Sequence, residues 1–256
     1  MKKNKLLLLV LLAGFAFSCK DTFIDPATYD QGFDYYPLAK GDYRIYSVTD
    51  INFKNNIGDT SRFQMREVVD TSFTDQTSTL KYKIIRATRK DEESDWVEDS
   101  VLVVSKSEEA VLLTKNNTTY VSLVFPVKEG KAWLGDAYNN RNRDDLESSP
   151  YDRKEFYTYT RVGEPFRFDP KELVEVPDGG VQFDQTATVV QGTPQDNFTQ
   201  LDDRKEVYAR GIGRVYRRFN RVVYCNESDS KTCPYGVGYK LNGNERHEIL
   251  VSYGHN

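Results

Sequence analysis

The chain has 256 residues and a formal net charge of −4, from 35 Lys and Arg against 39 Asp and Glu. A mildly acidic chain lacks the basic footprint that neutralises nucleic-acid phosphates, so we expect no nucleic-acid partner. The two histidines are too few for a His-based metal centre. We therefore expect neither a metal nor another cofactor.

Residues 1–18 have the pattern of an export signal that ends at a cysteine. Three lysines open the segment, residues 6–17 form an apolar run, and Ser18 stands directly before Cys19. The run is too short to remain as a membrane-spanning helix. We therefore predict cleavage before Cys19 and acylation of its thiol. Cleavage removes the three lysines and no acid, so the mature chain carries a charge near −7.

Acylated Cys19 would attach the mature chain to a lipid membrane of the cell envelope. Several acyl chains hold a protein far more firmly than one. Residues 19–34 are polar and contain Pro and Gly, which is typical of a tether between a lipid and a folded domain. Nothing after the signal reaches the ~20 apolar residues of a membrane span. We expect a tethered domain over residues 35–256.

The other two cysteines, Cys225 and Cys233, enclose seven polar, turn-prone residues. In an oxidising compartment this spacing favours a structural disulfide, which would contribute about 2.5 kcal/mol on the loop-entropy model. The alternative is a metal or redox pair. That alternative lacks the C-x-x-C spacing, and only His247 and His255 could complete a metal site.

The body of the chain alternates apolar and polar residues with the period of a β-strand. The alternating segments are rich in Val, Ile, Thr, Tyr and Phe, and lie at 43–53, 63–69, 80–89, 100–105, 110–113, 120–124, 183–191, 206–208, 214–224 and 247–253. Turn residues interrupt them at 55–59, 115–117 and 242–244. Only residues 146–159 are compatible with a short helix. The pattern predicts one all-β domain, built as a single antiparallel, strongly curved sheet or open barrel.

Short motifs connect the chain to a known group of proteins. They are Tyr36-Pro37-Leu38 with Gly41, the segment from Phe125-Pro126-Val127 to Trp133, and the segment from Tyr208 through Gly211-Ile212-Gly213 to Tyr216. With these motifs, the chain resembles an uncharacterised family of Bacteroidota lipoproteins over most of residues 35–224. The resemblance implies an all-β secreted domain and brings no catalytic residues. One departure is Leu134-Gly135-Asp136-Ala137-Tyr138, where the family pattern has Gly-Asn-Ala-Phe.

The residues before and after Cys19 are similar to those of the same family of lipoproteins. Lys20-Asp21 resembles the start of the signal that sends such lipoproteins to the cell surface, although Thr22 replaces a second acid. The resemblance favours the outer membrane over the inner one. It leaves open which face of that membrane carries the domain.

Candidate catalytic motifs have simpler structural explanations. Gly211-Ile212-Gly213 lacks the third glycine of a phosphate loop, so a glycine bulge between strands is preferred. His247 has no Gly-x-Ser-x-Gly partner, and we interpret it as a structural or surface histidine. The acids at 91–95 and 144–147 are interpreted as solvated turns. We expect no catalytic residues and no enzymatic activity.

One basic cluster lies in the last third of the chain, at Arg204, Lys205, Arg210, Arg214, Arg217, Arg218 and Arg221. Strand alternation would place Arg214 and Arg218 on one face and Arg217 and Arg221 on the other. A continuous anion-binding stripe is therefore not assured. Contact with lipopolysaccharide or an acidic glycan is one interpretation of the cluster, and pairing with neighbouring acids is preferred.

Three functional hypotheses remain open from the sequence. The first is a non-catalytic binding or structural domain of the envelope, with a protein or glycan as partner. The second is a half-barrel carrier of a lipid or another apolar ligand, with an aromatic-lined cavity. The third is a carbohydrate-active enzyme that uses two carboxylates facing each other across a cleft. The ligand-binding residues are unknown at this stage.

Overall fold

The computed structural model describes residues 30–138, 155–168, 180–226, 233 and 238–256. Cys19, the signal segment and residues 144–147 lie outside the described residues. The chain divides into two compact units, residues 1–30 and 31–256. The second unit is the β-domain, and it begins four residues before the predicted start at Tyr35.

The β-domain contains one short 3-10 helix, η3 (Phe33–Tyr35), followed by strands. The strands are β1 (Asp42–Lys54), β2 (Ile57–Thr74), β3 (Leu80–Arg89), β4 (Val97–Lys106), β5 (Ala110–Lys115), β6 (Thr118–Val124), β7 (Ala132–Leu134), β8 (Phe156–Phe168), β9 (Val181–Gln191), β10 (Gln195–Asp196), β11 (Gln200–Ala209), β12 (Gly213–Tyr224) and β13 (Lys240–His255). Every predicted strand segment lies within one of these strands. None of the helices among the described residues is long and apolar enough to cross a membrane.

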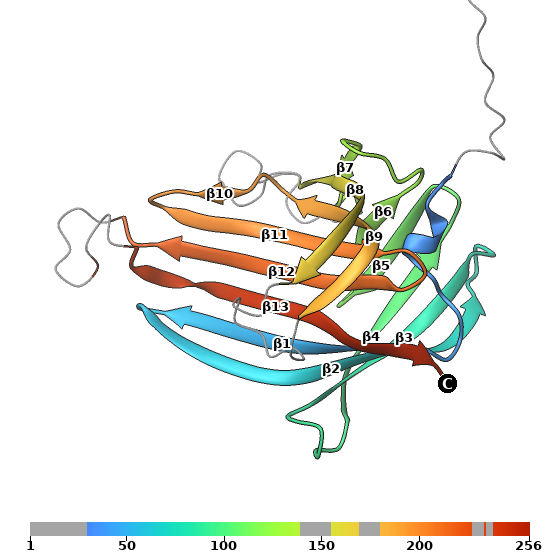
Figure 1. Ribbon diagram of the computed structural model, residues 1–256, viewed down its shortest axis with the longest axis horizontal. Helices are drawn as coiled ribbons and strands as arrows, with labels where there is room; N and C mark the ends of the chain where they lie inside the picture. Colours follow the sequence, from blue (N-terminus) through green and yellow to red (C-terminus); the bar gives the residue numbers. More distant parts are fainter. Residues whose placement is uncertain (1–29, 139–154, 169–179, 227–232, 234–237) are drawn as a thin grey trace, which may run out of the picture. The chain divides into compact units, whose positions relative to one another are not determined.

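All strands belong to a single antiparallel sheet, in the order β6-β5-β4-β3-β2-β1-β13-β12-β11-β9-β8-β7, with β10 paired to β11 (Figure 1). The pairing of β1 with β13 joins the two halves of the chain, from Asp42 opposite His255 to Lys54 opposite Asn242. The prediction of an all-β, single antiparallel sheet is confirmed.

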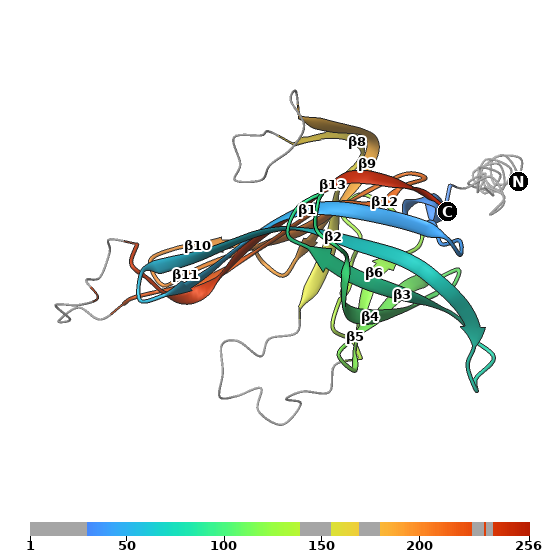
Figure 2. The ribbon, with the colours of Figure 1, turned by 90° about the horizontal axis from the view of Figure 1, so that it is seen from below.

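The sheet curls until its two ends meet. Figure 2 shows β3 to β6 turning away from the plane of the long strands, so that one face of the sheet becomes concave. At the seam, the Val121 N–H donates to the Gly135 carbonyl at 2.8 Å, and the Trp133 indole N–H donates to the Val121 carbonyl at 2.8 Å. The Tyr159 hydroxyl bridges the Val124 N–H and carbonyl at 3.0 and 2.9 Å. These bonds nearly close a barrel.

The concave side is packed with side chains next to the seam. The cluster consists of Tyr35, Val69, Ile84, Leu102, Val104, Val111, Val121, Leu123, Phe125, Val127, Trp133, Tyr157, Tyr159, Ala187, Val189 and Tyr208. Trp133 packs on Tyr159 with ring centroids 4.5 Å apart. Fully buried aromatic side chains are the largest apolar surfaces available to such a core.

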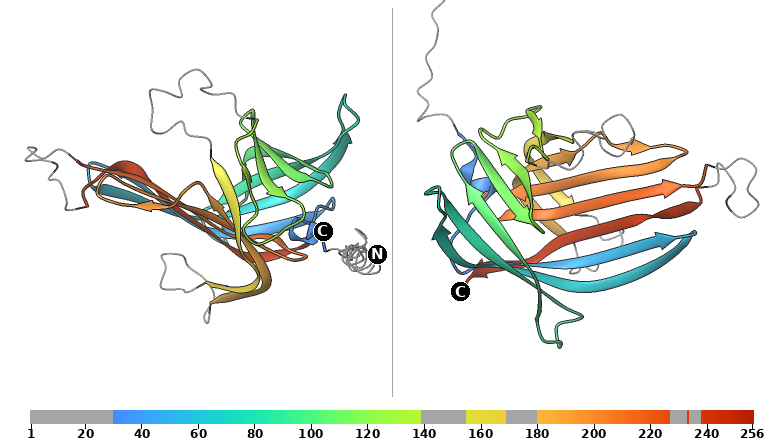
Figure 3. Two further views of the ribbon diagram at one scale, coloured as in Figure 1. Left: turned by 90° about the horizontal axis from the view of Figure 1, so that it is seen from above. Right: turned by 180° about the vertical axis from the view of Figure 1, so that it is seen from behind.

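Part of the opposite, convex face is covered by the sheet's own strands. Beyond a bulge at Arg161 and Gly163, the outer halves of β8 and β9 bend to the convex side, away from β3 to β6 (Figures 2 and 3). Phe166 and Phe168 then pack on Tyr216, with ring centroids 5.2 and 5.5 Å apart. The bend buries an apolar stripe of the sheet that would otherwise face water.

Two local predictions fail, each for a physical reason. Residues 242–244 do not end a strand but lie inside β13, paired with β1. There Gly243 is required by close packing, because a Cβ at this position would overlap the backbone of Arg221. In the stretch proposed for a short helix, Phe156–Tyr159 is strand β8, held in the sheet by pairing with β9.

The predicted disulfide between Cys225 and Cys233 is present at the end of β12, with Cα atoms 5.7 Å apart. The Cys225 N–H also donates to the Tyr239 carbonyl at 2.9 Å, which ties the stapled segment to the start of β13. This end of the sheet is the far end from Gln31, where the chain enters the β-domain (Figure 1).

Candidate functional site

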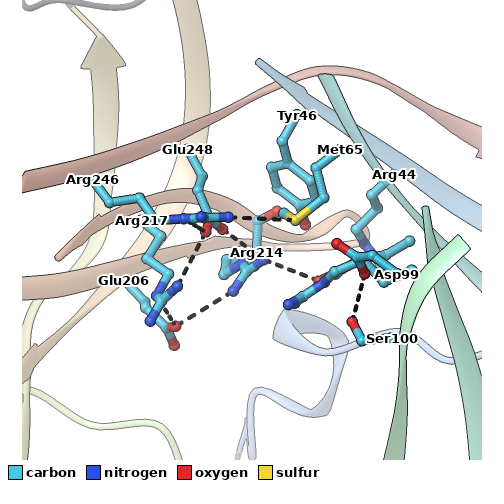
Figure 4. Close-up of polar contacts among 12 residues, drawn as sticks. Arg44, Tyr46, Met65, Asp99, Ser100, Glu206, Arg214, Arg217, Arg246 and Glu248 are labelled. Carbon is cyan, nitrogen blue, oxygen red and sulfur yellow. Dashed lines mark hydrogen bonds and ion pairs between the residues drawn. The ribbon is translucent and has the colours of Figure 1, made fainter. Parts of the chain in front are cut away.

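Charged side chains gather on the concave face where long strands cross the middle of the sheet. This group, which we call the charge network, consists of Asp50 on β1, Glu67 on β2, Arg86 on β3, Glu206 on β11, Arg214 and Arg217 on β12, and Arg246 and Glu248 on β13. Figure 4 shows its members on β11, β12 and β13. It contains four arginines and four carboxylates.

Glu248 is the most deeply buried member of the charge network, with no exposed surface. Its carboxylate accepts ion pairs from Arg214 at 3.1 Å, Arg217 at 3.1 Å and Arg246 at 2.7 Å. Burial alone would raise the pKa of Glu248, but the three guanidinium groups outweigh burial and hold this pKa well below its ordinary value. The carboxylate is therefore ionised; its Oε1 accepts hydrogen bonds from Arg217 and Arg246, and its Oε2 forms an ion pair with Arg214 without a hydrogen bond.

Arg214 connects the three glutamates of the charge network. In addition to Glu248, it reaches Glu67 at 3.2 Å and Glu206 at 3.5 Å, and its guanidinium lies 5.0 Å from the ring centre of Tyr46. Arg86 donates to Glu67 at 2.6 Å. Burial opposes ionisation of Glu67, but Arg214 and Arg86 lower its pKa below the ordinary value. A buried charge without such partners would be strongly unfavourable.

An open groove adjoins the charge network on the concave side. Its volume is about 480 Å³, within the range of small-molecule sites. Its lining residues are Asp50, Phe63, Arg86, Asp99, Ser100, Lys115, Asn116, Arg217, Phe219, Asn244 and Arg246, which come from β1 to β5 and from β12 and β13. We call it the concave groove. Four cationic side chains face two carboxylates in its lining.

The aromatic side chains of the concave groove are fixed by its arginines. Arg246 lies 5.5 Å from the ring centre of Phe63, and Arg217 lies 5.3 Å from that of Phe219. Arg246 also pairs with Asp50 at 2.9 Å across the β1–β13 register. The groove wall is therefore preorganised by cation–π contacts and ion pairs.

Lys115 is the cation of the concave groove that stands outside the charge network. Burial lowers the pKa of its ammonium group, and the positive charges of Arg86 and Arg217 lower it further. Burial is the larger cause, and the nearby carboxylate of Glu248 opposes the effect of the arginines. An anion placed in the groove would interact favourably with Lys115 and with the guanidinium groups around it.

The predicted distribution of the arginines over the two faces of the sheet is wrong, because a β-bulge interrupts the alternation of side chains. The register of β11 with β12 shifts, so that Tyr208 faces Arg214 while Val207 faces Tyr216 and Glu206 faces Arg217. Arg214 and Arg217 therefore share the concave face, whereas simple alternation separated them. The expected pairing of this cluster with acids is confirmed by the contacts of both residues with Glu206 and Glu248.

The other residues considered from the sequence lie away from the concave groove. Gly211-Ile212-Gly213 forms the turn between β11 and β12, where Gly213 has a φ of 97° and packs against the Arg44 guanidinium. His247 is a buried structural histidine on the convex side, 3.0 Å from the Tyr216 hydroxyl. Asp91 lies in an exposed turn with Ser94. Among the described residues, no group of His, Cys, Asp and Glu could hold a metal ion.

Sequence reasoning missed Glu67, Glu248 and Lys115 as site residues. Glu67 and Glu248 lie in the predicted strands 63–69 and 247–253, at positions that share a face with the apolar Val69 and Leu250. A charge on the inward face of a strand is a usable signal, since buried charges require partners. Lys115 gave no comparable signal, because a lysine beside two asparagines is typical of an exposed turn.

Comparisons with known proteins leave this chain without an assigned family. No protein-family model matches it, and no curated protein matches it. Two solved structures are similar: a protein described as exported, with a YmcC-like fold, from Bacteroides fragilis, and one described as a lipoprotein from Parabacteroides distasonis. Each is 12% identical, with a TM-score of 0.34, over 86% of this chain and 98% of the other. A TM-score this low does not establish a shared fold.

Proposed function

We propose that this chain is a membrane-anchored envelope protein whose β-domain binds an anionic ligand, without catalysis, in the concave groove. The observation that carries the proposal is the lining of the groove, which contains Arg86, Lys115, Arg217 and Arg246 beside the carboxylates Asp50 and Asp99. The three arginines also pair with Glu67, Glu206 and Glu248 of the charge network, and Lys115 stands outside that network. Carboxylate, sulfate and phosphate groups are the anions that arginine and lysine clusters recognise. Attachment through acylated Cys19 completes the proposal.

The size and polarity of the groove favour an acidic saccharide over a lipid. About 480 Å³ accommodates one or two sugar rings, and amide groups of Asn116 and Asn244 line it together with Phe63 and Phe219. A lipid carrier would need an apolar interior cavity. A pocket among the described interior residues has only about 30 Å³, and charged side chains such as Arg44, Glu67 and Arg86 line it beside tyrosines and leucines.

The ionisation of the carboxylates supports binding over hydrolysis. A glycosidase needs one carboxylic acid with a raised pKa to protonate the leaving group. Among the described residues, the carboxylates with a shifted pKa are Glu67, Asp75, Asp91 and Glu248, and each is shifted downward. Asp50, which belongs to both the charge network and the groove lining, is held by Arg246 at 2.9 Å.

The test is a calorimetric titration with digalacturonate, which carries two carboxylates on sugar rings, and with maltose as a neutral saccharide. We expect binding of digalacturonate alone, weakened about tenfold or more by Lys115→Gln, because a charged hydrogen bond contributes ~1.5–3 kcal/mol. Lys128→Gln, which changes an exposed lysine outside the groove, is the matched control and should bind like the parent. Binding should also weaken with added salt, and at high pH as Lys115 loses its proton.

Three results would contradict this proposal. Equal binding of maltose and digalacturonate would remove the role of charge. Equal weakening by Lys115→Gln and Lys128→Gln would remove the role of the groove. Hydrolysis of the glycan that is lost in Asp50→Asn or Asp99→Asn would show that the site is catalytic.

A further inference from the structure

An apolar patch lies at the end of the sheet where the chain enters the β-domain. It consists of Phe33, Leu38, Leu80 and Tyr82, and we call it the entry patch. Together with Lys106, Ser107 and Glu108, these residues line an open hollow of about 380 Å³. Phe33 is 37% exposed and Leu80 is 48% exposed. Contiguous exposed apolar side chains of this kind mark interaction surfaces.

Contacts with neighbouring segments of the sheet hold the entry patch in position. Lys106, at the end of β4, donates from its ammonium group to the Phe33 carbonyl at 2.8 Å and to the Tyr36 carbonyl at 2.9 Å. The Phe33 ring packs edge-on against Phe125, with centroids 4.8 Å apart. Val127 donates its N–H to the Gln31 carbonyl at 3.0 Å. The patch therefore has a fixed position next to the first residue of the β-domain.

The predicted tether keeps this end of the domain close to the membrane. Ten residues lie between Cys19 and Asp30. Such a segment spans at most about 40 Å when extended, and about 18 Å on average when flexible. A short tether gives a surface at its far end a high effective concentration, so that even a weak apolar contact forms. The opposite end of β1 lies farther from the start of the β-domain, by a strand length of about 40 Å.

We propose that the entry patch rests on the bilayer that holds Cys19, so that the β-domain stands on the membrane by this end. The proposal rests on the acylation of Cys19, which is part of the proposed function. Aromatic and aliphatic side chains at such a contact would enter the interfacial region, as in other peripheral proteins. The far end, with the Cys225–Cys233 disulfide, would point away from the lipid.

Tryptophan quenching tests the contact directly. The lipidated chain is reconstituted into phosphatidylcholine–phosphatidylglycerol vesicles that contain brominated phosphatidylcholine. Leu80→Trp places an indole in the entry patch, and Leu241→Trp places one at the far end, where Leu241 is 37% exposed. The unsubstituted chain supplies the background from Trp96 and Trp133. We expect brominated lipid to quench the added emission of Leu80→Trp at least twofold more than that of Leu241→Trp.

Two further measurements distinguish a loss of membrane contact from misfolding of one variant and from a loss of attachment. Tyr82→Trp is a second reporter in the same hollow, in case Leu80→Trp fails to fold. Co-sedimentation with the vesicles reports attachment separately from contact. A chain that sediments with the vesicles but shows equal quenching at both ends overturns the entry-patch contact alone. A chain that does not sediment overturns both this inference and the acylation of Cys19.

Discussion

Glu248 is the residue around which the arginines of the concave face are arranged. It is wholly buried, yet Arg214, Arg217 and Arg246 surround it closely enough to keep it ionised. Arg217 and Arg246 in turn contact Phe63, Phe219 and Asp50 of the groove wall. The wall of the concave groove is therefore coupled to one buried carboxylate.

We expect Glu248→Gln to destabilise the domain by about 3–5 kcal/mol, because it leaves three guanidinium groups without their shared counter-charge. Urea unfolding at neutral pH, followed by tryptophan fluorescence, measures this loss. Glu92→Gln, at an exposed position, is the control and should change the free energy of unfolding little. Equal stability of Glu248→Gln and the parent would contradict the assigned role.

A comparison of the parent with Glu248→Gln also tests how the free energy of unfolding depends on pH. The pKa of Glu248 is lower in the folded chain than its ordinary value of 4.5. Its ionisation therefore stabilises the fold above pH 4.5, and this contribution is lost as pH falls through the folded-state pKa. The stability difference between the parent and Glu248→Gln should narrow in acid. A difference that widens as pH falls would contradict this sign.

At the scale of elements, the seam between β6 and the β7–β8 hairpin determines whether the sheet is open or nearly closed. Few backbone bonds cross it, and side chains supply the rest, with Trp133 bonding to Val121 and Tyr159 to Val124. A sheet edge that is paired in this way offers no template for edge-to-edge aggregation.

We expect Tyr159→Phe to cost about 1–3 kcal/mol, since it leaves the Val124 N–H and carbonyl without the hydroxyl that bridges them. Hydrogen exchange of residues 121–125 should accelerate more than that of the β1–β13 pair, because the loss is local. Tyr253→Phe, at a 52% exposed position, is the control. Unchanged exchange at the seam would show that the hydroxyl does not hold it.

At the scale of the whole molecule, the two faces of the sheet differ in what covers them. The bend of β8 and β9 buries the convex stripe around Tyr216, and the charge network and the concave groove lie on the other face. The entry end and the groove are separate features of this domain. Anchoring and ligand binding are therefore expected to be separable by mutation.

Cys19→Ser tests this separation. We expect the variant to appear in the soluble fraction rather than the membrane fraction, because the acyl chains are the principal attachment. Digalacturonate binding by the released protein should equal that of the lipidated chain. Membrane retention of Cys19→Ser would contradict anchoring by lipid, and a loss of binding would contradict the separation.

The sequence by itself determined the all-β class, the disulfide and most of the strands, because period-two alternation and cysteine spacing are local signals. Strands β7, β8 and β10 lay outside the predicted segments. It also predicted the acid pairing of the arginines near Arg214. The strands and the disulfide depend on residues within one strand or one loop, whereas the acids that pair with Arg214 lie on β2, β11 and β13.

Only the tertiary structure decided which charged groups meet. The bulge between Val207 and Tyr208 moved Arg214 to the face of Arg217, and the β1–β13 pairing brought Asp50 to Arg246 across 196 residues. The seam at Trp133 and the position of Gly243 inside β13 likewise depend on strands that are distant in sequence. Register and closure arise from the packing of the whole sheet, and one shifted residue reverses the face of every side chain that follows.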